Sequence, residues 1–186
     1  MFKSLGAAAA ALALVAASAP ASAQCWNREE TSAATIRDLQ SLLMVATLRC
    51  RAAGMDITAD YNGFVSANRQ LVQHENDRIK AHFIRAAGPV AGQRAYDSFA
   101  THLANIYGGD ASTPDACENL ATVAREGALM ANSEEGLLLL ASRQGISTDL
   151  PGGMCERPTI AYGEGAPVTA RADVPPAYAM PAGYNH

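Results

Sequence analysis

The stretch IRDLQSLLMVATLRC, residues 36–50, decides the fold. Its apolar positions recur at steps of three and four, which is the period of an α-helix: Ile36, Leu39, Leu43, Ala46 and Cys50. Followed outward, this pattern predicts a first helix from about Asn27 to Ala53, ended by Gly54. Acidic residues near its start and basic residues near its end are in the order that the helix dipole favours.

Four further helical segments follow. A second helix is expected from about Thr58 to Ala87, and Gly88 and Pro89 separate it from a third, whose apolar heptads continue to Ile106. Thr113 and Pro114 mark the start of a fourth helix, and residues 134–143 form a short fifth. No alternating apolar pattern competes with them. The sequence therefore predicts an all-α fold, an up-down bundle of four to five helices.

The first 23 residues have the features of a cleavable signal peptide. Lys3 precedes an apolar block, residues 5–15, and Ala21-Ser22-Ala23 is a small-x-small triplet that signal peptidase accepts. The block is shorter than the roughly 20 residues that span a bilayer, so we expect no stable membrane insertion. We predict a cut after Ala23 and a periplasmic or secreted protein.

Charge and composition limit the partners and the domain. Because the signal segment holds one lysine and no acidic residue, the formal net charge of −4 becomes −5 after the cut. Such a chain has no electrostatic reason to bind nucleic acid. Residues 156–186 are rich in proline and alanine without helical periodicity, so we expect a disordered tail after a single domain, residues 24–155.

The four cysteines all follow the predicted cut, and an even count in an exported chain indicates disulfides. If the first helix is continuous, Cys25 and Cys50 lie about 38 Å apart, beyond disulfide reach. In an up-down bundle Cys50 lies at the end where the fourth helix begins with Cys117, and Cys155 can return to the end that holds Cys25. We predict the pairs Cys50–Cys117 and Cys25–Cys155, each stabilising the fold by about 4 kcal/mol in the chain-entropy account.

Candidate chemistry is sparse. No nucleophile, redox, haem or phosphate-binding motif is found, and we expect no cofactor. If the second and third helices are antiparallel about Gly88, His74 lies level with His102 and, with Glu75, could form a small metal or proton-exchanging site. Solvated histidines are the alternative that we favour.

Asn68 interrupts the apolar stripe of the second helix. It either marks a ligand pocket, with Tyr61, Tyr96 and Phe99, or makes a hydrogen bond that fixes the helix register, which we favour. Trp26 is either an exposed binding aromatic or, as we prefer, a cover over the neighbouring disulfide.

Four short stretches give the chain a resemblance. They are Cys25-Trp26, Leu42 to Cys50, Tyr61 to Val65 and the Pro-Gly-Gly-Met-Cys that ends at Cys155. With them the chain resembles a group of small exported bacterial helical proteins that have four cysteines and no established activity. The resemblance covers most of residues 25–155, and it implies no catalytic residue.

Three classes of function stay open. The leading hypothesis is a non-enzymatic periplasmic interaction module, such as an inhibitor, an immunity-type protein or a chaperone, whose partner is another envelope or secreted protein. The alternatives are a metal-dependent enzyme and a small-molecule carrier, each using a site between the second and third helices.

Overall fold

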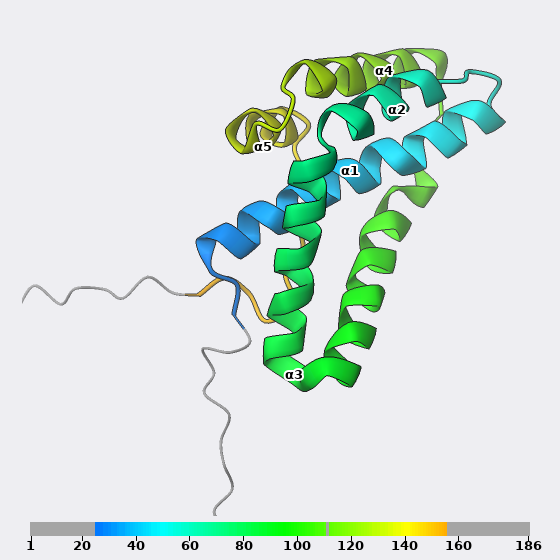
Figure 1. Ribbon diagram of the computed structural model, residues 1–186. Helices are drawn as coiled ribbons and strands as arrows, with labels where there is room; N and C mark the ends of the chain where they lie inside the picture. Colours follow the sequence, from blue (N-terminus) through cyan, green and yellow to red (C-terminus); the bar gives the residue numbers. More distant parts are fainter. Residues whose placement is uncertain (1–24, 111, 156–186) are drawn as a thin grey trace, which may run out of the picture. The chain divides into compact units, whose positions relative to one another are not determined.

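The computed structural model describes residues 25–110 and 112–155, which form a helical domain closed by two disulfides (Figure 1). Its elements are α1 (Arg28–Ala52), α2 (Thr58–Ala67), α3 (Arg69–Ile106), the short 3-10 helix η2 (Tyr107–Gly109), α4 (Pro114–Leu129) and α5 (Glu134–Arg143). Within the described ranges there is no strand, only one isolated bridge between Trp26 and Met154. The predicted all-α fold with two disulfides is confirmed.

Two predictions lie outside the described residues. They are the signal segment 1–23, with its cut after Ala23, and the disordered tail 156–186. None of the helices in residues 25–110 and 112–155 combines the length and the apolar character that crossing a bilayer requires.

Helix α1 begins and ends where the sequence predicts. The Asn27 side chain accepts the Glu30 N–H at 2.9 Å, and the Glu30 carboxylate accepts the Asn27 N–H at 3.0 Å. This capping box satisfies two N–H groups that the first turn leaves without partners. At the other end Gly54 has φ +89°, a backbone conformation that glycine adopts without strain. Because α1 contacts α2, α3, α4 and α5, it is the central helix of the domain.

The prediction of one helix from Thr58 to Ala87 is wrong, because the chain leaves the helical path at Asn68 (φ −109°, ψ 16°). The Asn68 Nδ2 donates to the Phe64 carbonyl at 3.0 Å and to the Gly127 carbonyl at 2.9 Å. Its Oδ1 accepts the Asn132 N–H at 2.9 Å. Asn68 thus makes hydrogen bonds, but they do not fix the register of one continuous helix; they join α2 to α4 and to the α4–α5 turn.

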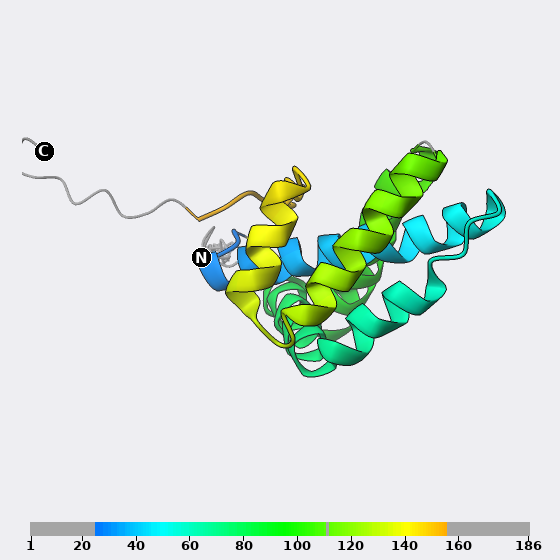
Figure 2. The same ribbon diagram turned by 90° about the horizontal axis from the view of Figure 1, so that it is seen from above.

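Helix α3 folds back on itself at Gly88, as the sequence predicts. Gly88 has φ 78° and ψ 172°, and Pro89 begins the second arm. The arms meet closely at Gly92, where a Cβ atom would lie 2.5 Å from the Phe83 carbonyl oxygen. Figure 1 shows both arms extending away from α1, while α2 and α4 lie side by side. In Figure 2 α4 crosses over α1, so α1 is covered by different helices along its length.

Both predicted disulfides are present. Cys50 at the end of α1 pairs with Cys117 in the first turn of α4, with 5.7 Å between their Cα atoms. Cys25 pairs with Cys155 across 4.9 Å. Beside this second disulfide, the backbone N–H of Trp26 donates to Gly153 and its carbonyl accepts from Cys155, both at 2.9 Å. The end of the described chain is thus fastened to the start of α1.

The helices α4 and α5 begin at the residues that the sequence indicates. The Thr113 hydroxyl accepts the Ala116 N–H at 3.2 Å, and the Ser133 hydroxyl accepts the Gly136 N–H at 3.1 Å. One core cluster joins α1 to α2, α4 and α5, a second joins α1 to the arms of α3, and a third surrounds the Cys50–Cys117 disulfide.

Candidate functional site

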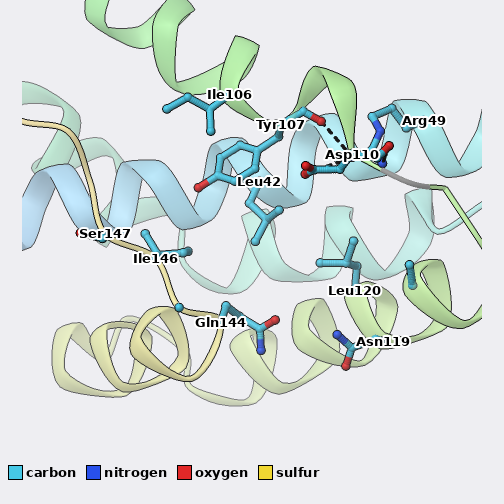
Figure 3. Close-up of a pocket in the computed structure, with 12 residues that line it drawn as sticks. Leu42, Arg49, Ile106, Tyr107, Asp110, Asn119, Leu120, Gln144, Ile146 and Ser147 are labelled. Carbon is cyan, nitrogen blue, oxygen red and sulfur yellow. Dashed lines mark hydrogen bonds and ion pairs between the residues drawn. The ribbon is translucent and has the colours of Figure 1, made fainter.

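A groove of about 460 Å³ lies where four separate segments meet, and we call it the η2 groove (Figure 3). It is lined by Leu42, Arg49, Ile106, Tyr107, Asp110, Ala116, Asn119, Leu120, Gln144, Gly145, Ile146 and Ser147. These residues come from α1, from the end of α3 with η2, from α4 and from the chain that follows α5. Aliphatic side chains make up much of the lining, and Asn119, Gln144 and Ser147 add hydrogen-bonding groups.

One arginine holds the η2 segment against α1. The Arg49 guanidinium donates to the Tyr107 carbonyl at 2.9 Å and to the Asp110 carbonyl, and its Nη1 lies 3.5 Å from the Asp110 carboxylate. The α3 helix ends at Ile106, and the 3-10 turn η2 follows it directly. Arg49 therefore does more than offset the helix dipole, because it fixes the wall of the groove that carries Tyr107.

One disulfide lies beside the groove, and the other fastens the chain that leaves it. Cys50 follows Arg49 in α1 and Cys117 follows Ala116 in α4, so this bond ties two walls together beside the groove. The other disulfide fastens the segment that leaves the groove at Ser147 to the start of α1. The Cys50–Cys117 disulfide thus limits how far the α1 and α4 walls of the groove can move apart.

Behind the groove lies a buried carboxylate. Asp38 is 2 % exposed and sits in α1 one turn before Leu42. Its Oδ1 accepts a hydrogen bond of 2.7 Å from the Tyr107 hydroxyl, so the ring that lines the groove connects the groove to the carboxylate. Burial raises the pKa of Asp38, and the hydrogen bond from Tyr107 offsets part of that effect. Burial and the Asp38 carboxylate together raise the pKa of Tyr107, so its hydroxyl stays protonated and donates.

The three residues predicted as a metal site have other partners. The exposed His74 has its Nε2 3.1 Å from an Arg78 guanidinium nitrogen, and the buried Glu75 carboxylate pairs with the same arginine at 2.8 Å. His102 lies 3.7 Å from the Asp149 carboxylate. Within residues 25–110 and 112–155, no group of three or more His, Cys, Asp or Glu side chains is placed to hold a metal ion. The structure therefore does not bring His74, Glu75 and His102 together as such a group.

The four residues predicted to share a pocket divide between two core clusters. Tyr61 packs against the cluster that joins α1, α2, α4 and α5, and Asn68 lies at the α2–α3 junction. Tyr96 and Phe99 belong to the cluster between α1 and the arms of α3. These residues fill core contacts, and none of the four lines the η2 groove.

Sequence reasoning missed a buried polar cluster around Trp26. This side chain is 1 % exposed, which excludes an exposed binding aromatic, the alternative that we did not prefer. Its indole stacks on the His82 ring with 3.9 Å between ring centroids, and its N–H donates to the Pro151 carbonyl at 2.9 Å. His82 Nδ1 lies 3.1 Å from Glu30 Oε2, and Arg85 donates to Glu30 Oε1 at 2.6 Å. The cluster joins the start of α1 to the first arm of α3.

Opposing effects set the charge states in this cluster. Burial alone raises the pKa of Glu30, but hydrogen bonds from Asn27, Arg85 and His82 outweigh it and hold that pKa below its usual range. Burial lowers the pKa of His82, and the Glu30 carboxylate offsets part of that effect. The sequence could indicate one contact of Glu30, because this residue is three positions after Asn27, as a capping box requires. Its contact with His82, 52 residues away, has no local sequence pattern.

The comparisons with known proteins place the chain in no family. No protein-family model, no curated protein and no solved structure matches it. The resemblance noted in the sequence therefore stays a prediction, and the function has to be argued from the site itself.

Proposed function

We propose that this chain is an exported binding protein that engages another envelope or secreted protein through the η2 groove. Export is supported by Lys3, the apolar block and the Ala21-Ser22-Ala23 triplet, and by two disulfides of the kind that persist in oxidising compartments. Binding without catalysis is the hypothesis that the sequence favours.

The observation that carries the proposal is an open groove whose α1 and α4 walls are joined by the Cys50–Cys117 disulfide. Interfaces gain affinity when apolar side chains enter a preformed pocket and the surrounding polar groups keep hydrogen-bond partners. The η2 groove offers both features, since Leu42 and Leu120 line it beside the exposed Asn119. Ile106 is 45 % exposed at its edge, where a partner would cover it.

A matched pair of substitutions in α3 tests this proposal. Ile106→Arg places a bulky charge in the groove, whereas Val90→Arg makes the same kind of change at a side chain that is 67 % exposed and does not line the groove. Wild-type protein and both variants, purified in folded form, are used to capture crosslinked partners from an envelope extract. We expect wild type and Val90→Arg to enrich the same protein, and Ile106→Arg to bind it at least about tenfold more weakly.

Two results contradict the proposal. One is a set of captured proteins that does not change between the two variants, which would place the binding surface elsewhere. The other is the loss of capture by Val90→Arg while Ile106→Arg still binds. Circular dichroism and thermal unfolding of both variants establish that a lost interaction does not reflect a lost fold.

A further inference from the structure

Asp38 is a buried charge that lacks a cationic partner. Among the described residues it forms no ion pair; His102 acts on it only at a distance and has its own carboxylate partner, Asp149. Buried carboxylates in folded proteins are normally paired, because desolvation of an unpaired charge is unfavourable. In this domain Glu30 and Glu75 follow that rule, since arginines pair with both. Asp38 is the exception, and it lies behind a groove.

The other charges at the groove cancel each other. Arg49 and Asp110 are the charged residues among those that line it, and they pair with one another. Asp38 therefore leaves the groove with one uncompensated negative charge, buried where solvent screens it weakly.

Tyr107 carries the effect of that charge to the surface of the groove. Its hydroxyl hydrogen is committed to Asp38, which leaves the hydroxyl oxygen as an acceptor for a donor from a ligand. Figure 3 shows the ring between Ile106 and Leu42, with the hydroxyl on the side of Ile146. A ring face beside aliphatic side chains suits a hydrocarbon stem, and the hydroxyl end suits a cationic head.

We propose that the η2 groove binds a basic side chain, lysine or arginine, presented by the protein partner, with the aliphatic stem on Leu42 and Ile106 and the cation beside Tyr107 and Asp38. This inference rests on the proposed function and names the chemistry of its partner. The cation of the ligand provides the positive partner that the Asp38 carboxylate lacks in the free protein. Binding therefore stabilises this buried charge, and the stem of the ligand covers apolar surface.

Small probes test the ligand class without knowledge of the partner. They are the Nα-acetyl methylamides of lysine, norleucine and glutamate, titrated into the purified protein while the methyl NMR signals of Leu42, Ile106, Leu120 and Ile146 are followed. Norleucine has an aliphatic stem like that of lysine without the charge. We expect the lysine probe to shift these signals and to bind at least about tenfold more tightly than norleucine, and glutamate to bind more weakly than either.

Two variants assign the preference to Asp38. Asp38→Asn keeps an oxygen that accepts the Tyr107 hydroxyl and removes the charge; the ratio of lysine to norleucine affinity should fall to near one. Asp77→Asn is the matched control, because it removes the same charge from an exposed side chain of α3 that does not line the groove; the ratio should stay as in wild type.

Equal affinity of the wild type for lysine and norleucine overturns the inference, as does a preference for glutamate, an absence of shifts at the groove, or a ratio unchanged by Asp38→Asn. If Asp38→Asn does not fold, the three probes on wild-type protein decide the ligand class alone. Capture of the partner through Ile106 without any lysine preference would leave the proposed function standing and reject only this inference.

Discussion

At the scale of single residues, the Asp38 carboxylate is buried where its charged form is unfavourable. Burial disfavours the charged form of Asp38, and its hydrogen bonds with Tyr107 and Thr148 do not compensate for it fully. Unfavourable charges of this kind concentrate at binding sites, where they stabilise a complex at the expense of the free protein.

Asp38→Asn should therefore stabilise the free protein at neutral pH. Because the pKa of Asp38 is raised in the folded state, the folded protein holds this proton more firmly than the unfolded chain does. The contribution of the protonated Asp38 to the free energy of unfolding is complete below the ordinary aspartate pKa. It is lost as the pH rises through the raised pKa of the folded state. Urea unfolding at pH 7 should show a gain of about 1 kcal/mol for the variant, and the gain should shrink on acidification. A loss of stability at pH 7 would contradict this reasoning.

Trp26 offers an optical readout of His82, because it is the single tryptophan and stacks on that ring. Protonated imidazole quenches a stacked indole by accepting an electron from its excited state. Since burial lowers the pKa of His82, the emission of Trp26 should fall only as the pH drops below the usual histidine range. The unfolded chain takes up that proton first, so stability should begin to decline as the pH falls through the usual histidine range and should level off once the folded protein is also protonated.

His82→Gln is the control for this titration, because it keeps a polar side chain and removes the titrating ring. The loss of emission in this pH range should disappear in the variant. Emission that falls equally in both proteins would show that another group controls the fluorescence.

At the scale of helices, Asn68 shows what the sequence could predict and what it could not. The ends of α1, the reversal at Gly88 and the starts of α4 and α5 follow from local chemistry: caps, glycines and a proline. The break at Asn68 depends on Gly127 and Asn132, which are 59 and 64 residues away. No local pattern encodes those partners, so the periodicity alone favoured a continuous helix.

Asn68→Ala should destabilise the domain markedly. The substitution leaves the buried Gly127 carbonyl without its partner, at a cost of about 1–3 kcal/mol, and also removes the hydrogen bond to the Asn132 N–H. We expect a loss of roughly 3 kcal/mol in urea unfolding. Asn62→Ala, at an exposed position in α2, is the matched control and should change stability by less than about 0.5 kcal/mol. Equal losses for the two variants would mean that the Asn68 bonds do not hold α2 against α4.

The candidate site was harder to predict than the helices. Leu42, Tyr107, Leu120 and Ile146 come from four segments, and their meeting depends on how α3 and α4 cross α1. From the sequence, Arg49 was interpreted only as a cation that stabilises the helix dipole. Its two carbonyl partners lie about 60 residues further along the chain, so no local pattern indicates them. One signal was available, since Asp38 is a charge within the most buried helix, between Ile36 and Leu39.

At the scale of the whole molecule, the two disulfides differ in how accessible they are to solvent. Cys50 and Cys117 are buried, whereas Cys25 and Cys155 are partly exposed. A small thiol reductant should therefore cleave Cys25–Cys155 first, because attack on a disulfide requires access to its sulfur atoms.

Graded reduction, followed by alkylation and peptide mapping, measures this order. Cys25 and Cys155 should be labelled well before the other pair, while the helical content stays high. Simultaneous labelling of all four cysteines, together with loss of the helices, would show that the domain unfolds in one step. The buried disulfide would then not maintain the fold after the other is reduced.

The central claim is that the η2 groove is the surface that meets a partner. A photoreactive amino acid placed at Asn119, at the rim of the groove, and separately at Val90, outside it, reports contacts directly in the cells that produce the protein. The account predicts a discrete crosslinked adduct from position 119 that Ile106→Arg diminishes, and none of that mass from position 90. The same adduct from both positions, or an adduct from position 90 alone, would contradict it.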